Sequence, residues 1–111
     1  MDIDHAVIAF SALSQETRLR VFKLLIEYGK ESTAAGTLSE ELKIPHNTLS
    51  FHLSHLSHAG LITSKRQERS IIYTANTDAM EKLIGYLNEN CCIRETVTVE
   101  CCPPPKKGKQ K

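Results

Sequence analysis

The fold of this chain is decided by residues 45–60, whose sequence is PHNTLSFHLSHLSHAG. At about 100° per residue, Leu49, Leu53 and Leu56 fall within one narrow stripe of a helix. The opposite side carries small polar residues and one large aromatic residue, Phe51. The stretch therefore predicts an amphipathic helix that begins beside the proline and ends at the glycine.

The flanking sequence predicts what this helix packs against. Hydrophobic periodicity and turn residues predict helices over 3–13, 15–28, 34–42, 46–59 and 77–91, and strands over 61–66 and 70–75. Ser14 and Thr77 are the expected N-caps of the second and last helices. The fold class is mostly α with a small β-hairpin, in the order α-α-α-α-β-β-α. This order is a winged helix-turn-helix.

Length and composition restrict the class of protein. The 111 residues fit one domain with a modest core, which a partner subunit would help to stabilise. No apolar run approaches about 20 residues, so no membrane span is expected. The N-terminus does not resemble a secretory signal, so we expect a cytoplasmic protein with reduced cysteines. The formal net charge of +1 neither favours nor excludes a nucleic-acid partner.

The polar face of the helix over 46–59 suits the major groove of double-stranded DNA. Asparagine can bond adenine at two atoms, serine can bond base edges or phosphates, and phenylalanine can contact a thymine methyl. A solvated helix face would carry similar polar residues, but it does not explain an exposed aromatic ring. The candidate DNA-binding residues on this helix are His46, Asn47, Thr48, Ser50, Phe51 and His52.

Two further sets of residues have competing interpretations. Arg66 and Arg69 in the hairpin are candidates for phosphate or minor-groove contact, or are ordinary hairpin charges. His52, His55 and His58 have a spacing that could indicate zinc. Their directions fan over about 120° on a helix, so packing at the edge of the core or an approach to DNA is favoured.

Several motifs in order resemble the ArsR/SmtB family of winged-helix metal-responsive repressors. They are LSQETRLR at 13–20, PHNTLSFHL at 45–53, and Leu56 with the AGLI ending at 59–62. The resemblance covers residues 3 to 92. It implies a homodimer built by the first and last helices, an inverted-repeat operator, and repression that an inducer relieves. At the wing, the family often has a glycine where this chain has Glu68.

All four cysteines lie in the last fifth of the chain, as the adjacent pairs Cys91–Cys92 and Cys101–Cys102. The sequence ENCC at 89–92 resembles the arsenic repressors of the family, whose ligands lie at the end of the last helix. Adjacent pairs are a poor zinc signature, because four-cysteine zinc sites use wider spacing. Ligation by thiolates alone favours As(III), Sb(III) or another soft ion. We expect Cys91, Cys92 and Cys101 as ligands, with Cys102 as a substitute.

The sequence therefore predicts an arsenite-responsive repressor that binds operator DNA as a homodimer. Residues 1–92 would form the DNA-binding and dimerisation domain, and 93–111 a flexible tail carrying the second thiol pair. A disulfide-based redox sensor on the same fold and a metal-buffering protein that does not bind DNA are the alternatives. No histidine lies near the thiols in sequence to act as a base, so we expect neither enzyme activity nor a catalytic cofactor.

Overall fold

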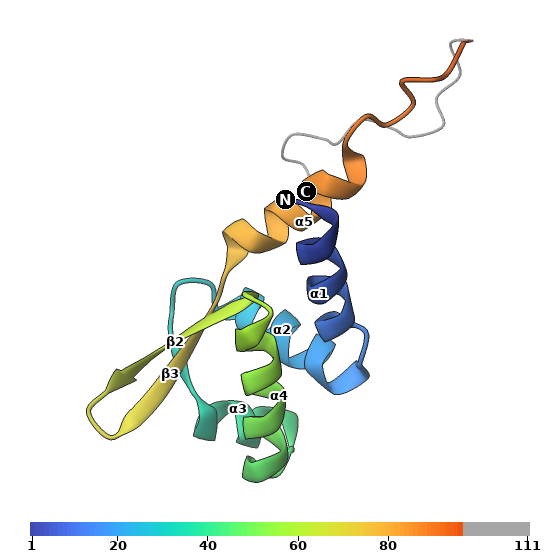
Figure 1. The fold of residues 1–111 in the computed structure, drawn as a ribbon. Coiled ribbons are helices and arrows are strands. Elements are labelled where there is room, and N and C mark those ends of the chain that lie inside the picture. The colour runs from blue at the N-terminus through green and yellow to red at the C-terminus, as the bar shows by residue number, and fades with distance from the viewer. Residues whose placement is uncertain (97–111) are drawn as a thin grey trace.

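The computed structural model describes residues 1–96, which form five helices and one three-stranded antiparallel sheet (Figure 1). The elements are α1 (Ile3–Leu13), α2 (Glu16–Tyr28), β1 (Thr33–Ala34), α3 (Ala35–Leu42), α4 (His46–His58), β2 (Ile62–Gln67), β3 (Ser70–Ala75) and α5 (Thr77–Asn88). The predicted winged helix-turn-helix is confirmed. Within this part of the chain, no helix is both long and apolar enough to cross a membrane.

The core forms around the leucine stripe of α4. Leu49, Leu53 and Leu56 are essentially inaccessible to solvent, as predicted from their spacing. They meet Leu25 from α2 and Leu38 from α3, which are equally buried. Full burial of each leucine side chain stabilises the fold by about 1.5–3 kcal/mol. The opposite face of α4 is thereby fixed towards solvent.

Helix α1 packs through its smallest residues. Ala6, Ala9 and Ala12 are buried against the core, while the large apolar residues that predicted the helix, among them Val7 and Phe10, are exposed. Alanines let α1 lie close to its neighbours α2, α4 and α5. The large side chains of α1 are therefore left outside the core of the protomer.

The helix starts differ from the predicted caps by one residue. Gln15, not Ser14, is the N-cap of α2, and its side chain accepts the backbone N–H three residues later. Asn76, not Thr77, caps α5 in the same way. In both cases the side-chain oxygen of the neighbouring residue accepts a backbone N–H of the first helical turn, so that residue is the N-cap.

The sheet has one strand more than the sequence predicted. β1 spans the first residue of the helix expected over 34–42 and the residue before it, and it pairs with β3 through Thr33–Tyr73 and Ala34–Ile72. β2 and β3 form the wing, and their turn places Glu68 at a φ of 57°. That left-handed conformation favours glycine, and in this chain a glutamate adopts it.

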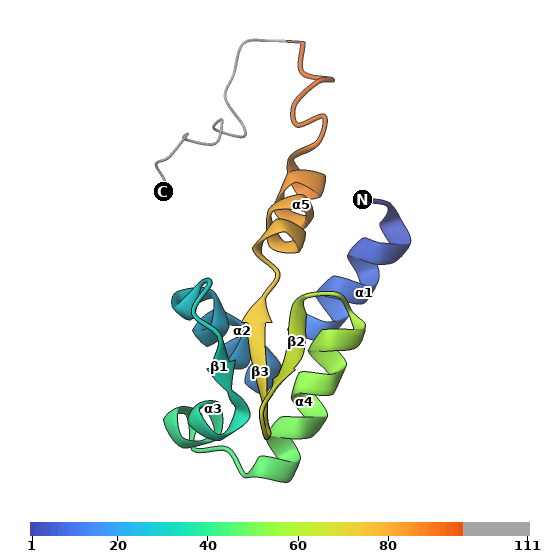
Figure 2. The same ribbon diagram turned by 90° about the vertical axis from the view of Figure 1, so that its left-hand side faces the viewer.

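The two ends of the molecule differ in composition. Figure 2 shows α3 and the start of α4 at one end, on either side of β3, and α5 with the start of α1 at the other. The polar exposed residues at the start of α4 therefore lie in a different region of the molecule from the exposed apolar residues of α1 and α5. A surface that contacts DNA and a surface that contacts a second subunit can therefore coexist.

Candidate DNA-reading surface and thiol pair

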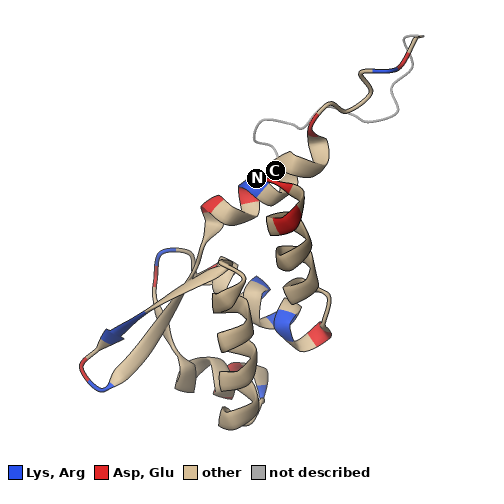
Figure 3. Cartoon of the chain, in the orientation of Figure 1, with Lys and Arg blue, Asp and Glu red and all other residues tan. Residues whose placement is uncertain are grey.

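The exposed face of α4 is polar and carries no formal charge. Asn47, Thr48 and Ser50 are exposed, and Phe51 retains 66% of its accessible surface. In Figure 3 the ribbon of α4 is tan, because residues 46–58 include no Lys, Arg, Asp or Glu, while the wing carries several charges. Contacts from α4 therefore depend on hydrogen bonds and apolar contact, and attraction to phosphate has to come from elsewhere.

Asn47 is held in a defined position by its own helix. Its side-chain oxygen accepts the backbone N–H of Thr48 at 2.9 Å. Pro45 occupies the N-cap position of α4, and no side-chain hydrogen bond caps the helix from there. Bidentate bonding to an adenine would require the Asn47 oxygen to leave Thr48.

His52 does not share the exposure of the other candidates. Its side chain is buried, with 8% of its surface accessible, and Nη1 of Arg18 lies 3.5 Å from its Nδ1. The same Arg18 donates through Nε to the carbonyl oxygen of Ala12 at 2.7 Å. Burial, followed by the charges of Arg18 and His55, lowers the pKa of His52. The histidines were expected either to pack at the edge of the core or to approach DNA, and His52 packs at the edge of the core.

His55 and His58 have local partners. His58 Nδ1 lies 2.9 Å from the carbonyl oxygen of Ser54, and Phe51 packs edge-on against the His52 and His55 rings. Residues 1–96 contain no group of three or more histidine, cysteine or acidic side chains placed to hold a metal ion. The histidine spacing therefore has a structural explanation.

The wing brings one arginine to the start of α4. Arg66 and Arg69 are both exposed, on β2 and in the turn after it. Arg69 lines a cleft of about 290 Å³ together with His46 and Ser50 of α4, whereas Arg66 does not. The cleft thus brings Arg69 of the wing together with His46 and Ser50 of α4, all three of them predicted DNA-binding residues.

The thiol pair lies beyond α5, not on it. The helix ends at Asn88, and residues 89–94 form successive turns with Asn90 and Cys92 at φ values of 59° and 63°. The prediction of a helix over 77–91, with Cys91 on its apolar stripe, is wrong at its end, because Asn88 and Asn90 favour local turns over another helical turn. Cys91 is exposed, and its sulfur lies 3.3 Å from that of Cys92. Cys101 and Cys102 lie outside the described residues.

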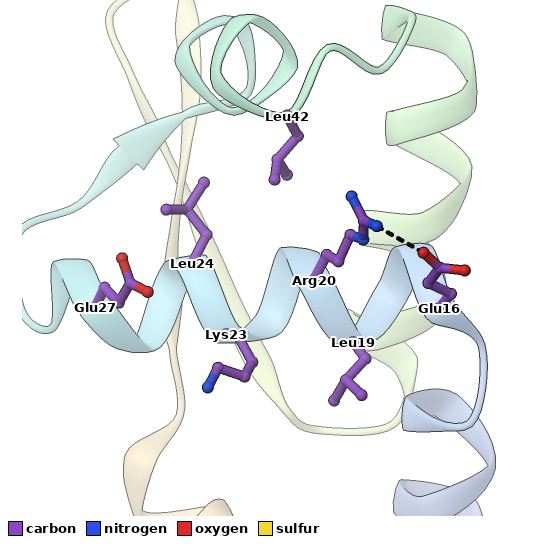
Figure 4. Close-up of a pocket in the computed structure, with 7 residues that line it drawn as sticks. All are labelled: Glu16, Leu19, Arg20, Lys23, Leu24, Glu27 and Leu42. Atoms are coloured by element: carbon purple, nitrogen blue, oxygen red, sulfur yellow. Dashed lines mark hydrogen bonds and ion pairs between the residues drawn. The ribbon is translucent and has the colours of Figure 1, made fainter.

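Two further hollows border α2. One, of about 330 Å³, is almost entirely apolar and is lined from three helices, with Phe10, Leu19, Met80 and Leu87 among its residues. The other, of about 460 Å³, lies between α2 and the end of α3. In Figure 4, Leu24 and Leu42 approach each other across it, and Arg20 is bonded to Glu16. None of the residues predicted to bind DNA or metal lines either hollow.

Two residues close to the predicted DNA-binding residues, Arg18 and Gly36, were not predicted from the sequence. Arg18 lies within the quoted motif at 13–20, but nothing in the sequence pointed to a contact with His52, 34 positions away. Gly36, at the start of α3, lines the same cleft as Arg69. A glycine inside a predicted helix is the one signal that could have drawn attention to it, because glycine there is unfavourable.

Comparisons with known proteins agree with this geometry. A family described as a helix-turn-helix domain matches residues 13–65. The chain is 31% identical over 88 residues to the nodulation protein NolR of Rhizobium meliloti, covering 79% of this chain and 70% of that protein. It is 32% identical over 94 residues to the arsenical resistance operon repressor of Bacillus subtilis, covering 84% and 86%.

A solved structure has the same fold. The ArsR-like transcriptional regulator from Rhodococcus sp. RHA1 superposes with a TM-score of 0.68 at 28% identity, covering 77% of each chain. The similarity extends over most of both chains, beyond the helix-turn-helix itself.

Proposed function

Because this chain belongs to the ArsR/SmtB family of winged helix-turn-helix transcriptional regulators, we propose that it is an arsenite-responsive repressor. It is a DNA-binding regulator and not an enzyme. In our proposal it binds operator DNA as a homodimer and leaves the operator when As(III) binds its cysteine thiols. Membership of a regulator family sets aside the metal-buffering alternative, which required that the chain not bind DNA.

The observation that carries the arsenite proposal is the geometry of the thiol pair. The two sulfur atoms are 3.3 Å apart, less than twice a metal–sulfur bond of about 2.3 Å, so both can contact one ion on the same side. The φ of Cys92 is positive, and residues other than glycine rarely adopt such a backbone conformation. Such backbone strain is often found at binding sites.

The chemistry of arsenite fits a set of three thiols. At neutral pH arsenite is arsenous acid, an uncharged arsenic centre with three hydroxyl groups. Each thiol displaces one hydroxyl as water, so three As–S bonds form, three As–O bonds break, and no charge changes. Two thiols come from Cys91 and Cys92. We propose Cys101 as the third, with Cys102 as its substitute, and Sb(III) as a second ion able to bind the same set.

The proposed dimer surface consists of the exposed apolar residues of α1 and α5. Val7 and Phe10 on α1 and Ile84 and Leu87 on α5 are exposed in the protomer. They adjoin or line the apolar groove between α1, α2 and α5. Apolar surface of this extent on a folded chain is the usual mark of an interaction site. A symmetric pair of such faces gives a two-fold dimer.

The proposed reading surface combines α4 with the wing. Asn47, Thr48 and Phe51 face the bases, while Ser50, His46 and Arg69 contact the backbone beside them, and Arg66 adds charge along the wing. His52 holds α4 in place from the inside. Two such surfaces in a dimer meet half-sites about 34–36 Å apart.

Release follows from where the thiols lie. Cys91 is three residues beyond the end of α5, and Leu87 lies in the last turn of that helix. Drawing Cys91, Cys92 and a tail thiol onto one ion changes the path of the chain next to the proposed dimer surface. A small rotation of one subunit against the other then moves the two α4 helices out of register with the half-sites. In our proposal the boundary between the domain and the tail lies between residues 92 and 93.

The same sulfur distance favours one alternative, a redox sensor. Peroxide would take two electrons and two protons from the thiols, forming one S–S bond and two molecules of water. The experiment is therefore a titration of DNA binding with arsenite, zinc, cadmium and peroxide in parallel, using upstream DNA located by footprinting. Release by arsenite but not by peroxide supports the proposal, and release by peroxide alone contradicts it.

Cysteine variants locate the response. Cys91→Ser with Cys92→Ser should bind DNA as the parent does and fail to release with arsenite. Cys102→Ser is the matched control and should still release. A double variant that dissociated normally on arsenite would rule out this site.

A further inference from the structure

The side chain of Arg18 connects three helices of the protomer. Arg18 lies in the first turn of α2, and its Nε donates to the carbonyl oxygen of Ala12, in the last turn of α1, at 2.7 Å. Its Nη1 lies 3.5 Å from Nδ1 of His52, in the middle of α4. One guanidinium group therefore joins the helix that carries the exposed Val7 and Phe10 to the helix that carries the polar reading face.

The shape and charge of arginine suit both contacts. Its N–H groups point in fixed directions in one plane, so two acceptors on different helices can be held at once. The last carbonyl oxygens of a helix lack partners within the helix, and a cation near them is favourable. Arg18 is half-buried, and its two partners, Ala12 and His52, are buried. The link therefore belongs to the packing between the helices and is not a surface contact.

The contact with His52 requires a neutral imidazole ring. A guanidinium group only donates hydrogen bonds, so Nδ1 has to accept and the ring proton has to lie on Nε2. Burial lowers the pKa of His52, which favours the neutral ring at pH 7. The charges that act on this ring are those of Arg18 on α2 and His55 on α4; within residues 1–96, none comes from α1, α3 or β2, the other elements packed on α4. A proton on Nδ1 would set donor against donor and charge against like charge.

The His52 ring also contacts the reading face. It packs edge-on against the ring of Phe51, with the centroids 5.7 Å apart. Phe51 is one of the residues proposed to face the bases. A displacement of the His52 ring is therefore passed to a residue of the reading face by direct contact.

We propose that Arg18 is the positioning residue of the reading helix: it sets the orientation of α4 relative to α1, and it does so only while His52 is neutral. Because α1 carries part of the proposed dimer surface, this link determines how each α4 stands relative to the two-fold axis. Binding to operator needs both reading helices in register with their half-sites, whereas attraction to the phosphates of an unrelated duplex does not. The proposal rests on the proposed reading and dimer surfaces and is independent of the inducer.

The first test removes the link. Arg18→Gln should bind operator about 10-fold more weakly, because a charged hydrogen bond that holds α4 is lost. Its affinity for unrelated duplexes should fall much less. Arg20→Gln is the matched control, because it removes the same charge from the same helix and Arg20 is paired only with Glu16 of its own helix. The control should bind operator within about two-fold of the parent. Equal losses of operator affinity in the two variants would overturn the proposal.

The second test follows the pH and begins with the parent chain, so it does not depend on how a variant folds. The ratio of operator affinity to affinity for an unrelated duplex should fall as the pH is lowered below 6.5, the ordinary pKa of histidine. Protonation of exposed histidines such as His46 strengthens both complexes and largely cancels in the ratio. His52→Asn keeps an acceptor, Oδ1, at the equivalent place along the side chain but cannot be protonated, so its ratio should stay constant. A parent ratio that does not change with pH, or one that changes equally in His52→Asn, contradicts the proposal.

Measurements of fold and assembly separate positioning from stability. Circular dichroism of Arg18→Gln should show the helix content of the parent, and sedimentation equilibrium should show the parent's dimer Kd. A loss of helix content or of the dimer in step with the loss of operator binding would mean that Arg18 only stabilises the fold, and this proposal alone would fail. A parent chain that formed no dimer would contradict the proposed function as well.

Discussion

Leu87 offers a quantitative test of the proposed dimer surface. In the protomer, 64% of its surface is exposed at the last turn of α5. Leu87→Gln keeps the helix propensity nearly unchanged and replaces apolar surface by a polar amide, so the loss of apolar burial is the smallest effect expected. Full burial of an exposed leucine stabilises by about 1.5–3 kcal/mol, so burying the exposed part contributes roughly 1–2 kcal/mol per protomer.

A two-fold interface contains the residue twice. The substitution should therefore weaken dimerisation by roughly 2–4 kcal/mol, a factor of about 30 to 700 in the dimer Kd. Sedimentation equilibrium over a range of protein concentrations measures that constant directly. Ile71→Gln is the control, because Ile71 is also apolar and 42% exposed but lies on the wing. A Leu87→Gln dimer as tight as the parent, or as tight as Ile71→Gln, would refute the assignment of this surface.

Three more predictions concern the reading helix and the thiols. Asn47→Ala should weaken binding to operator by about 1–3 kcal/mol and to unrelated duplexes hardly at all, as competition gel shifts would measure; equal losses on both would mean that Asn47 reads no base. The pKa of His52 lies below its ordinary 6.5, so the unfolded chain takes up this proton first as the pH falls. The contribution of neutral His52 to stability is therefore fully present above pH 6.5 and decreases as the pH falls below that value, and His52→Gln should flatten denaturant-measured stability in that range. Arsenite affinity should vary little near neutral pH, whereas cadmium affinity should rise with pH, because only cadmium must displace protons; calorimetry in matched buffers distinguishes the two.

The sequence predicted the elements whose packing lies within the protomer. The period of Leu49, Leu53 and Leu56 matches an α-helix, and all three are buried. The same reasoning could not tell which partner covers an apolar stripe. Val7 and Phe10 predicted α1 correctly, yet the protomer buries Ala6, Ala9 and Ala12 instead. Periodicity identifies a face that avoids water, whether a core or a second subunit covers it.

Features set by distant residues were beyond the sequence. β1 has only two residues, too few for any period, and exists through its pairing with β3. His52 lies at the edge of the α4 stripe, and its neighbour Arg18 is 34 positions away in the sequence. The end of α5 was misjudged for a local reason. The apolar stripe points towards Cys91, but Asn88 and the residues after it form turns instead.

The absence of formal charge on α4 has a consequence for how such a protein searches a genome. Sliding along arbitrary DNA depends on long-range attraction to phosphates, which in the proposed function comes from the wing and not from α4. The helix gains little free energy on a wrong sequence, because its hydrogen-bonding groups find no matching bases there. In the proposed function, discrimination between sequences therefore comes from the groups of α4, and the salt-dependent attraction comes from the wing.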